Sequence, residues 1–254
     1  MPIHASAEEG YAAVGADYEK GRPGYTPDAV AYLLQRLGVA RSGDTKRVVD
    51  LAAGTGKFTR ALLNAGVTPI AVEPVAHMRE TLAEHCPNVR TYSGSAESIP
   101  LEDDSVDAVT VAQAFHWFDG PAALAEIHRV LKPLGGLGLL WNGVDRSVPW
   151  LDAIWTEVDA RRDDTPHAWT YEWKDAFAAT AAFSPLISAT FRYEQPTDRE
   201  GLIARLMSIS FIARGSQESR DALIAHARQV ADDAQLPETF DIPYNCFVHW
   251  CRAV

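Results

Sequence analysis

Short apolar runs alternate with amphipathic segments through the first part of this chain. The runs have the length of buried strands, and the segments between them place leucine, isoleucine and valine at helical spacing. The expected strands are residues 48–51, 69–72, 89–92, 104–112 and 134–141. Strands and helices in this alternation predict βαβ units, and therefore a largely parallel α/β sheet.

The pattern changes after residue 142. Helices are expected at 150–162, 172–182, 199–212 and 218–234, with strands at 188–194 and 244–250. Long insertions between late strands are typical of a lid or a substrate wall. We therefore expect a single domain over 1–254, with an N-terminal arm and helix (1–40), a cofactor-binding core (41–142) and a helical elaboration (143–186 and 198–236).

The first expected strand runs through Asp50 into a loop that contains Gly54 and Gly56. Glycines there allow a ligand to approach the backbone, and the free N–H groups that open the next helix offer donors. Such a loop can also serve close packing alone. Glu73, which ends the second strand, favours a ligand, because a carboxylate at this position can accept both hydroxyls of a ribose.

Two further loops follow strands of the predicted sheet. Residues 94–97 form a turn-rich loop with an acid, and residues 113–119 bring aromatic side chains and His116 to the carboxyl end of a central strand. Open α/β sheets bind their ligands at this edge. The sequence thus predicts one pocket built from several loops.

Composition and charge exclude several classes of partner. The formal net charge is -11, which disfavours binding to nucleic acid or to an anionic membrane. No apolar run reaches the roughly 20 residues of a membrane span, and residues 1–10 do not resemble a signal peptide, so we expect a cytoplasmic protein. Cys246, His249 and Cys251 raise the possibility of zinc, but strand alternation puts the two cysteines on opposite faces, so no metal site is expected.

In their order, these motifs resemble the class I S-adenosylmethionine-dependent methyltransferases over roughly residues 10–142. The resemblance rests on the loop 50–56, Glu73, the loop 94–97, the segment 113–119 and the turn 131–136. The arm 18–25 and the run 115–118 are similar to a small-molecule subgroup, the trans-aconitate-type or methyltransferase type 11 proteins. The family implies a Rossmann-like, seven-stranded, mostly parallel sheet with its last strand antiparallel, helices on both faces and a helical lid insertion after strand five.

The resemblance also implies S-adenosyl-L-methionine as cofactor and assigns roles by position. Asp50 would orient the methionine amino group, Glu73 would hold the ribose, and the Ala96 N–H would meet the adenine, while Arg22 is the candidate for the methionine carboxylate. The implied cofactor-binding set is Tyr18, Arg22, Asp50, Ala52, Gly54, Gly56, Glu73, Pro74, Met78, Ser95, Ala96, Glu97 and Gln113. The expected substrate-binding set is Tyr25, Phe115, His116 and Trp117.

Two residues depart from the family pattern. Ala52 stands where the first glycine is usual, a change that a loop without positive φ there tolerates. Ser95 stands where an aspartate often accepts from the adenine amino group, and a hydroxyl accepts more weakly than a carboxylate. Cofactor binding is therefore expected to be looser, unless Glu97 substitutes.

The expected reaction is in-line methyl transfer to an oxygen, or less favourably a nitrogen, of a small-molecule acceptor, by a monomer or homodimer. His116 is the candidate general base, although it could instead hydrogen-bond a backbone group. Arg161 and Arg162 could meet an anionic substrate, although a solvated helix end is the simpler interpretation. The alternatives are a catalytically silent cofactor-binding protein, or an NAD-dependent dehydrogenase, against which stands Thr59 at the position of the third glycine.

Overall fold

The computed structural model describes residues 21–39, 46–162 and 166–254. Tyr18 and most of the predicted arm lie outside these residues. Of the helices that the described residues form, none combines the length and the apolar character needed to cross a bilayer.

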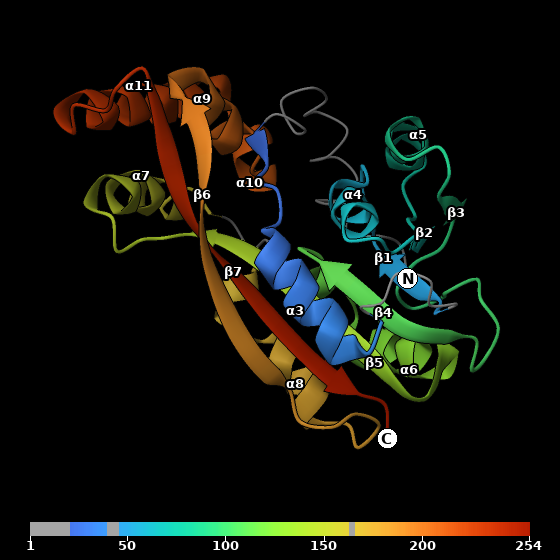
Figure 1. Ribbon diagram of the computed structural model, residues 1–254. Helices are drawn as coiled ribbons and strands as arrows, with labels where there is room; N and C mark the ends of the chain where they lie inside the picture. The colour runs from blue at the N-terminus through green and yellow to red at the C-terminus, as the bar shows by residue number, and fades with distance from the viewer. Residues whose placement is uncertain (1–20, 40–45, 163–165) are drawn as a thin grey trace.

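The core is a seven-stranded sheet in the order β3-β2-β1-β4-β5-β7-β6 (Figure 1). Its strands are β1 (Val48–Leu51), β2 (Ile70–Val72), β3 (Arg90–Tyr92), β4 (Val106–Ala112), β5 (Leu131–Val144), β6 (Ile187–Asp198) and β7 (Thr239–Arg252). The strands from β1 to β5 pair in parallel, while β7 is antiparallel to both β5 and β6. This confirms the predicted mostly parallel sheet with an antiparallel last strand.

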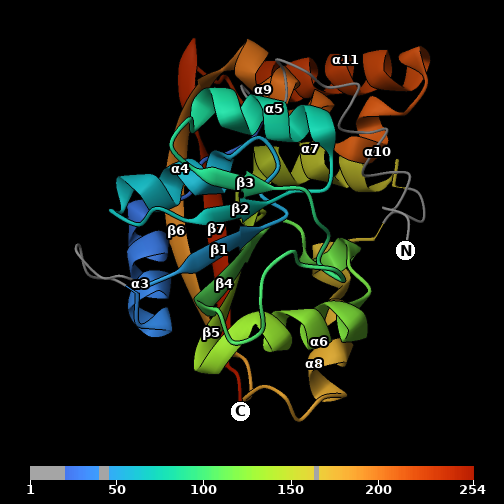
Figure 2. The same ribbon diagram turned by 90° about the vertical axis from the view of Figure 1, so that its right-hand side faces the viewer.

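Helices cover both faces of the sheet (Figure 2). On one face α3 and α4 pack against an apolar core, and on the other α6 and α8 pack against a second core. Cys246 belongs to the first core and Cys251 to the second, so the two thiols lie on opposite faces. The helices that cover the two faces are α3 (Pro27–Leu37), α4 (Lys57–Asn64), α5 (Ala76–His85), α6 (Gly120–Val130) and α8 (Trp173–Ala178).

Four helices from the late part of the chain gather at one end of the long strands β6 and β7 (Figure 1). They are α7 (Pro149–Asp159), α9 (Arg199–Met207), α10 (Ser210–Ala213) and α11 (Gln217–Asp233). Their apolar faces share a separate core with Ile242 and Tyr244 of β7. The expected helical insertion after strand five is therefore present. Two short 3-10 helices, η1 (Phe115–Trp117) and η2 (Ala168–Thr170), complete the fold.

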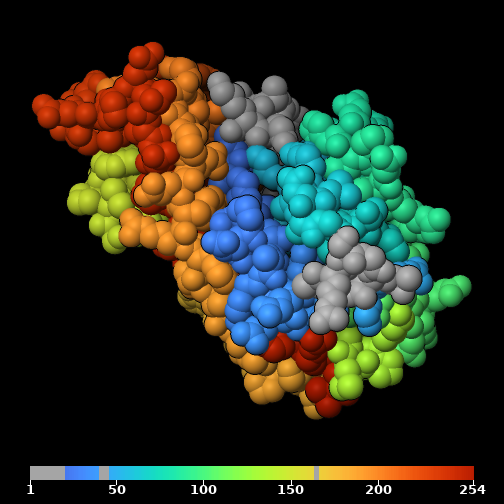
Figure 3. Space-filling model, in the orientation of Figure 1, coloured from blue at the N-terminus to red at the C-terminus, as the bar shows by residue number. Residues whose placement is uncertain are grey.

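Helix α3 lies directly on the backbone of β5. A Cβ at Gly138 would lie 2.7 Å from Leu33 Cδ1, and one at Gly136 would lie 2.6 Å from Leu37 Cδ2. Glycine therefore permits this close approach. In the space-filling view, α3 fills the surface between β6 and α4 (Figure 3).

Strands β5 and β6 are longer than the predicted 134–141 and 188–194. β6 pairs with β7 along its whole length, from Ile187 to Asp198, and β5 pairs with β7 from Gly136 to Val144. β6 is an edge strand, and Arg192, Glu194 and Pro196 on it are exposed. Charged residues and proline protect such an edge from pairing with another chain, and they also obscure the strand pattern in the sequence.

Candidate active site

The loop between β1 and α4 has three residues with positive φ: Ala52 at 56°, Gly54 at 56° and Gly56 at 84°. A left-handed conformation costs an L-residue roughly 1–2 kcal/mol. The expectation that Ala52 occupies a position without positive φ was therefore wrong. At residue 52 the loop keeps the left-handed backbone conformation that favours glycine, and Ala52 therefore carries the associated backbone strain.

The two glycines of this loop have different neighbours. A Cβ on Gly54 would face Met78 Sδ at 4.0 Å, across a cavity that both residues line. A Cβ on Gly56 would lie 3.1 Å from Leu82 Cγ and 3.4 Å from Cys86 Sγ, and Gly56 does not line that cavity. Gly56 thus brings α4 close to α5, and its role in cofactor binding stays a prediction.

This first cavity has a volume of about 450 Å³. It lies where the loops after β1, β2, β3 and β4 meet, at the edge of the sheet that the sequence predicted. Except for Gly56, every predicted cofactor-binding residue that the structure describes lines it: Arg22, Asp50, Ala52, Gly54, Glu73, Pro74, Met78, Ser95, Ala96, Glu97 and Gln113. The predicted substrate residues Tyr25 and Trp117 line it as well.

Asp50 is a buried carboxylate with one unsatisfied oxygen. Its Oδ2 accepts a 2.6 Å hydrogen bond from Thr59 Oγ1, whereas Oδ1 is buried and has no hydrogen-bond partner among the described residues. Burial raises the pKa of Asp50 to about 7; the Thr59 bond opposes this rise and the charge of Glu73 adds to it. An unpaired acidic oxygen in the cavity wall suits a cationic group of a ligand.

Glu73 holds the glycine loop from the end of β2. Its Oε2 accepts from the Gly54 N–H and its Oε1 from the Val75 N–H, both at 2.9 Å. Burial raises the pKa of Glu73, although the two backbone hydrogen bonds and the charge of Arg79 oppose that rise. Each carboxylate oxygen has a further lone pair, so Glu73 can brace the loop and still accept from a ligand.

The loop at 94–97 closes the far wall of this cavity. Ser95 and Ser98 form an isolated β-bridge, and Glu97 Oε1 accepts from the Asp119 N–H at 3.1 Å. Glu97 is therefore tied to the N-terminal end of α6. Whether it also replaces the missing adenine-side aspartate stays a prediction.

A second cavity of about 540 Å³ adjoins the first. Arg22, Gln113 and Trp117 line both. Of the pair Arg161 and Arg162, which the sequence offered for an anionic substrate, Arg162 lines this cavity and Arg161 does not. The side chains of the other walls include Asn142, Arg146, Trp155, Asp159, His167, Trp169, Arg205 and Phe211. These residues come from β5, η2 and the late helices with their adjoining loops, and nothing in their spacing could have brought them together before folding.

The run 115–118 divides between these cavities and the core. His116 lines the second cavity and Trp117 lines both, whereas Phe115 lines neither. Phe115 is buried against Phe118 and Phe177, with ring centroids at 5.5 and 5.2 Å. The 3-10 turn thus places the Phe115 ring in the core and not in a cavity wall, and a substrate-binding role for Phe115 stays a prediction.

His116 is held neutral. Its Nδ1 is 3.1 Å from Trp141 Nε1, and since an indole N–H can only donate, Nδ1 is the acceptor and the ring proton belongs on Nε2. Burial lowers the pKa of His116 to about 3, helped by the charges of His167 and Arg22. A base role for His116 stays a prediction, and this geometry favours hydrogen-bond donation from Nε2 instead.

Comparison with known proteins gives the family of this site. The model of a methyltransferase domain matches residues 49–139. A methyltransferase-like protein of Schizosaccharomyces pombe is 36% identical over 217 residues, which cover 85% of this chain and 83% of that protein. A Mycobacterium tuberculosis methyltransferase is 47% identical over 139 residues, which is 55% of this chain and 54% of the relative.

Among solved structures, a type II methyltransferase from Anaeromyxobacter dehalogenans has a similar fold, with a TM-score of 0.64 and 22% identity over 91% of this chain and 97% of that one. The trans-aconitate-type subgroup stays a prediction, and the dehydrogenase alternative is set aside. With a relative of this identity and coverage, the chain belongs to the class I S-adenosylmethionine-dependent methyltransferases.

Proposed function

We propose that this chain transfers a methyl group from S-adenosyl-L-methionine to an oxygen atom of a small-molecule acceptor. One observation carries the proposal: two adjoining cavities share Arg22, Gln113 and Trp117, and the first contains the unsatisfied Asp50 Oδ1. A reaction between a cofactor and a second ligand needs two such cavities with a common wall.

The residues of the first cavity fit this cofactor. Asp50 Oδ1 would accept from the methionine ammonium, and the free lone pairs of Glu73 would accept from the ribose hydroxyls. Arg22 is the candidate for the methionine carboxylate, with Met78 and Pro74 as apolar walls. When bound, the cofactor supplies an electrophilic methyl group on a sulfonium.

The protein itself aligns the acceptor and excludes water, since methyl transfer from a sulfonium needs no acid at the leaving group. Arginine side chains outnumber acids in the second cavity, which disfavours a cationic amine and favours an oxygen acceptor. His116 lines this cavity, and its Nε2–H would donate to the acceptor.

Calorimetric titration with S-adenosylmethionine tests the cofactor assignment. The parent is expected to bind, and Glu73→Ala is expected to weaken binding about 10- to 100-fold through loss of charge-assisted hydrogen bonds. Glu80→Ala, at an exposed position on α5, is the matched control. A Glu73→Ala variant that binds as tightly as the parent would contradict the assignment.

An acceptor screen tests the reaction. Alcohols, phenols, carboxylic acids and amines are incubated with the protein and S-adenosylmethionine, and release of S-adenosylhomocysteine is measured. Turnover confined to amines would refute the oxygen acceptor. Cofactor binding without turnover on any class would support the silent cofactor-binding protein instead.

A further inference from the structure

Arg205, on α9, is a buried guanidinium in the wall of the second cavity. Its side chain is among the buried polar groups, at 8% exposure. Nε donates to the Tyr244 hydroxyl at 3.2 Å and Nη1 to Ser208 Oγ at 3.4 Å, while the Trp155 ring lies 5.7 Å from the guanidinium carbon. These partners are all neutral, and no carboxylate of the described residues forms an ion pair with Arg205.

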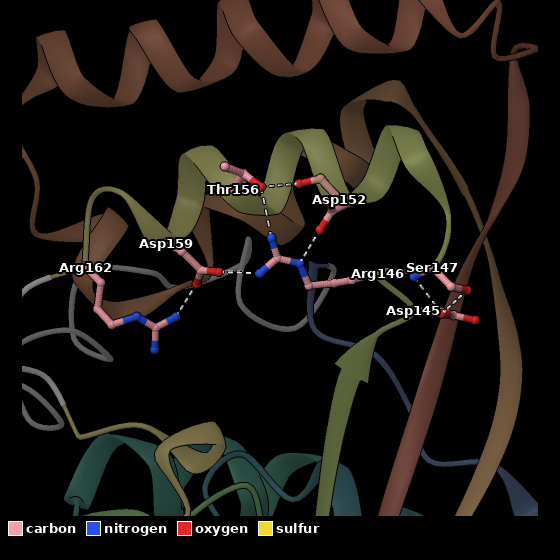
Figure 4. Close-up of polar contacts among 7 residues, drawn as sticks. All are labelled: Asp145, Arg146, Ser147, Asp152, Thr156, Asp159 and Arg162. Atoms are coloured by element: carbon pink, nitrogen blue, oxygen red, sulfur yellow. Dashed lines mark hydrogen bonds and ion pairs between the residues drawn. The ribbon is translucent and has the colours of Figure 1, made fainter.

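The other arginines on the late side of this cavity differ in that respect. Arg146 donates to Asp152 and Asp159 of α7, and Arg162 donates to the other oxygen of Asp159 (Figure 4). Asp159 is the one acid among the described residues that line the cavity, and its two oxygens are taken by these two arginines. No acid of the described lining is therefore left for Arg205.

A buried charge with only neutral partners is costly. Removal of an ion from water is energetically unfavourable, and hydrogen bonds to hydroxyl groups compensate only part of this cost. Burial and the positive charge of Arg22, which lines the same cavity, lower the pKa of Arg205, against the opposing effect of Tyr244. An anion bound in the cavity would compensate the remainder.

We propose that Arg205 binds an oxyanion group of the methyl acceptor, a carboxylate or a phosphate, and so determines which acceptors enter the second cavity. The planar guanidinium matches both groups through paired N–H donors. Arg162 Nη1, buried without a hydrogen-bond partner among the described residues, is a second donor in the same wall.

This oxyanion is distinct from the reacting oxygen. Arg205 does not line the first cavity, whereas Arg22, Gln113 and Trp117 line both cavities and therefore mark their junction. The acceptor thus carries one oxygen to be methylated and, separately, an anionic group that Arg205 retains. The inference rests on the proposed function and specifies its substrate class.

The test is anion binding, measured by tryptophan fluorescence in the presence of S-adenosylhomocysteine, with Trp155, Trp117 and Trp169 in the cavity wall as reporters. The probes are glutarate, glycerol phosphate and the neutral glutaramide. We expect the parent to bind glutarate or glycerol phosphate at least tenfold more tightly than glutaramide. The stronger of the two anions identifies the oxyanion as carboxylate or phosphate.

The variants are Arg205→Met and Arg205→Lys. Arg205→Met approximates the length of the side chain without its charge, and Arg205→Lys keeps the charge without the paired N–H donors of the guanidinium. Arg205→Met is expected to weaken anion binding at least tenfold and Arg205→Lys by less, with glutaramide binding unchanged. Arg199→Met, on the same helix and paired with Asp232, is the control, expected to change binding less than twofold.

Equal binding of anion and amide by the parent, no anion binding up to 50 mM, or full anion binding by Arg205→Met would each overturn the proposal. Affinity for S-adenosylhomocysteine, measured on every variant, shows that the fold is intact. Should Arg205→Met fail to fold, Arg205→Lys and the comparison of anion with amide on the parent still decide. Failure of the proposed function would be seen separately, as absence of S-adenosylmethionine binding in calorimetry. The anion titration can also be run without S-adenosylhomocysteine, so it does not depend on that result.

Discussion

Replacement of Asp50 by asparagine removes a charge that folding buries. Burial raises the pKa of Asp50 from its ordinary 3.8 to about 7, so in this interval the folded protein retains a proton that the unfolded chain has released. The stability of the parent therefore falls as pH rises through this interval, and the full penalty above pH 7 is about 4 kcal/mol. Asparagine carries no such penalty, but its unpartnered amide N–H group costs about 1–3 kcal/mol at every pH.

The diagnostic quantity is how the difference in unfolding free energy between Asp50→Asn and the parent changes with pH. It is expected to shift by about 3 kcal/mol in favour of the variant between pH 5 and pH 8. The shift accumulates over the two pH units from pH 5 to the folded pKa of about 7, because each unit of difference in proton binding corresponds to about 1.4 kcal/mol. Urea unfolding followed by circular dichroism, without cofactor, measures it at each pH. Ionisations shared by both proteins cancel in the difference.

Asp107→Asn is the control, because its environment acts in the opposite sense. Burial alone would raise the pKa of Asp107, but hydrogen bonds from the Arg47 N–H and from Lys132 and Lys46 outweigh it and lower the pKa. Asp107 is then ionised in both states above pH 5, so its variant should be destabilised by a constant amount from pH 5 to 8. A pH-independent difference for Asp50→Asn as well would refute the reasoning.

Four further predictions follow from the structure. Affinity for S-adenosylmethionine should fall as pH drops below about 7, by up to tenfold per unit, because in the proposed binding mode its ammonium group would pair with ionised Asp50; calorimetry checks this. Ala52→Gly should raise the free energy of unfolding by about 0.5–1 kcal/mol in urea, through relief of the left-handed strain. Gly138→Ala should lower it by about 1–3 kcal/mol through the clash with α3, whereas Gly24→Ala, with nothing within 4 Å of the added Cβ, should change it little. His116→Gln should keep turnover within tenfold, because an amide can donate in place of Nε2–H; loss of more than a hundredfold would support the base role instead.

The walls of the first cavity could be predicted because its residues follow directly from local patterns. Asp50, Glu73 and the loop at 94–97 each end or follow a strand, and parallel strands bring their carboxyl ends to one edge of the sheet. The hydrophobic pattern likewise gave the order and type of most elements.

Most walls of the second cavity could not be predicted in this way. Arg205 is on α9, Trp155 on α7 and Asn142 on β5, and they meet only after β7 pairs with both β5 and β6. The backbone conformation of Ala52 could not be predicted from the sequence either, because its positive φ depends on the path of the loop and not on the residue type. The burial of Phe115 was not predicted either, because a 3-10 turn, unlike a strand or helix, leaves no periodic signal of which side chain faces inward.

Arg22 gives the two halves of the site a thermodynamic connection. Its guanidinium donates to the Ser208 carbonyl beyond α9, its own carbonyl accepts from Lys57 at the start of α4, and the residue lines both cavities. If a ligand in the first cavity shifts Arg22 and thereby changes the affinity of the second cavity, linkage requires the ligand of the second cavity to change the affinity of the first by the same factor. An apparent dissociation constant for either ligand is therefore defined only at a stated concentration of the other.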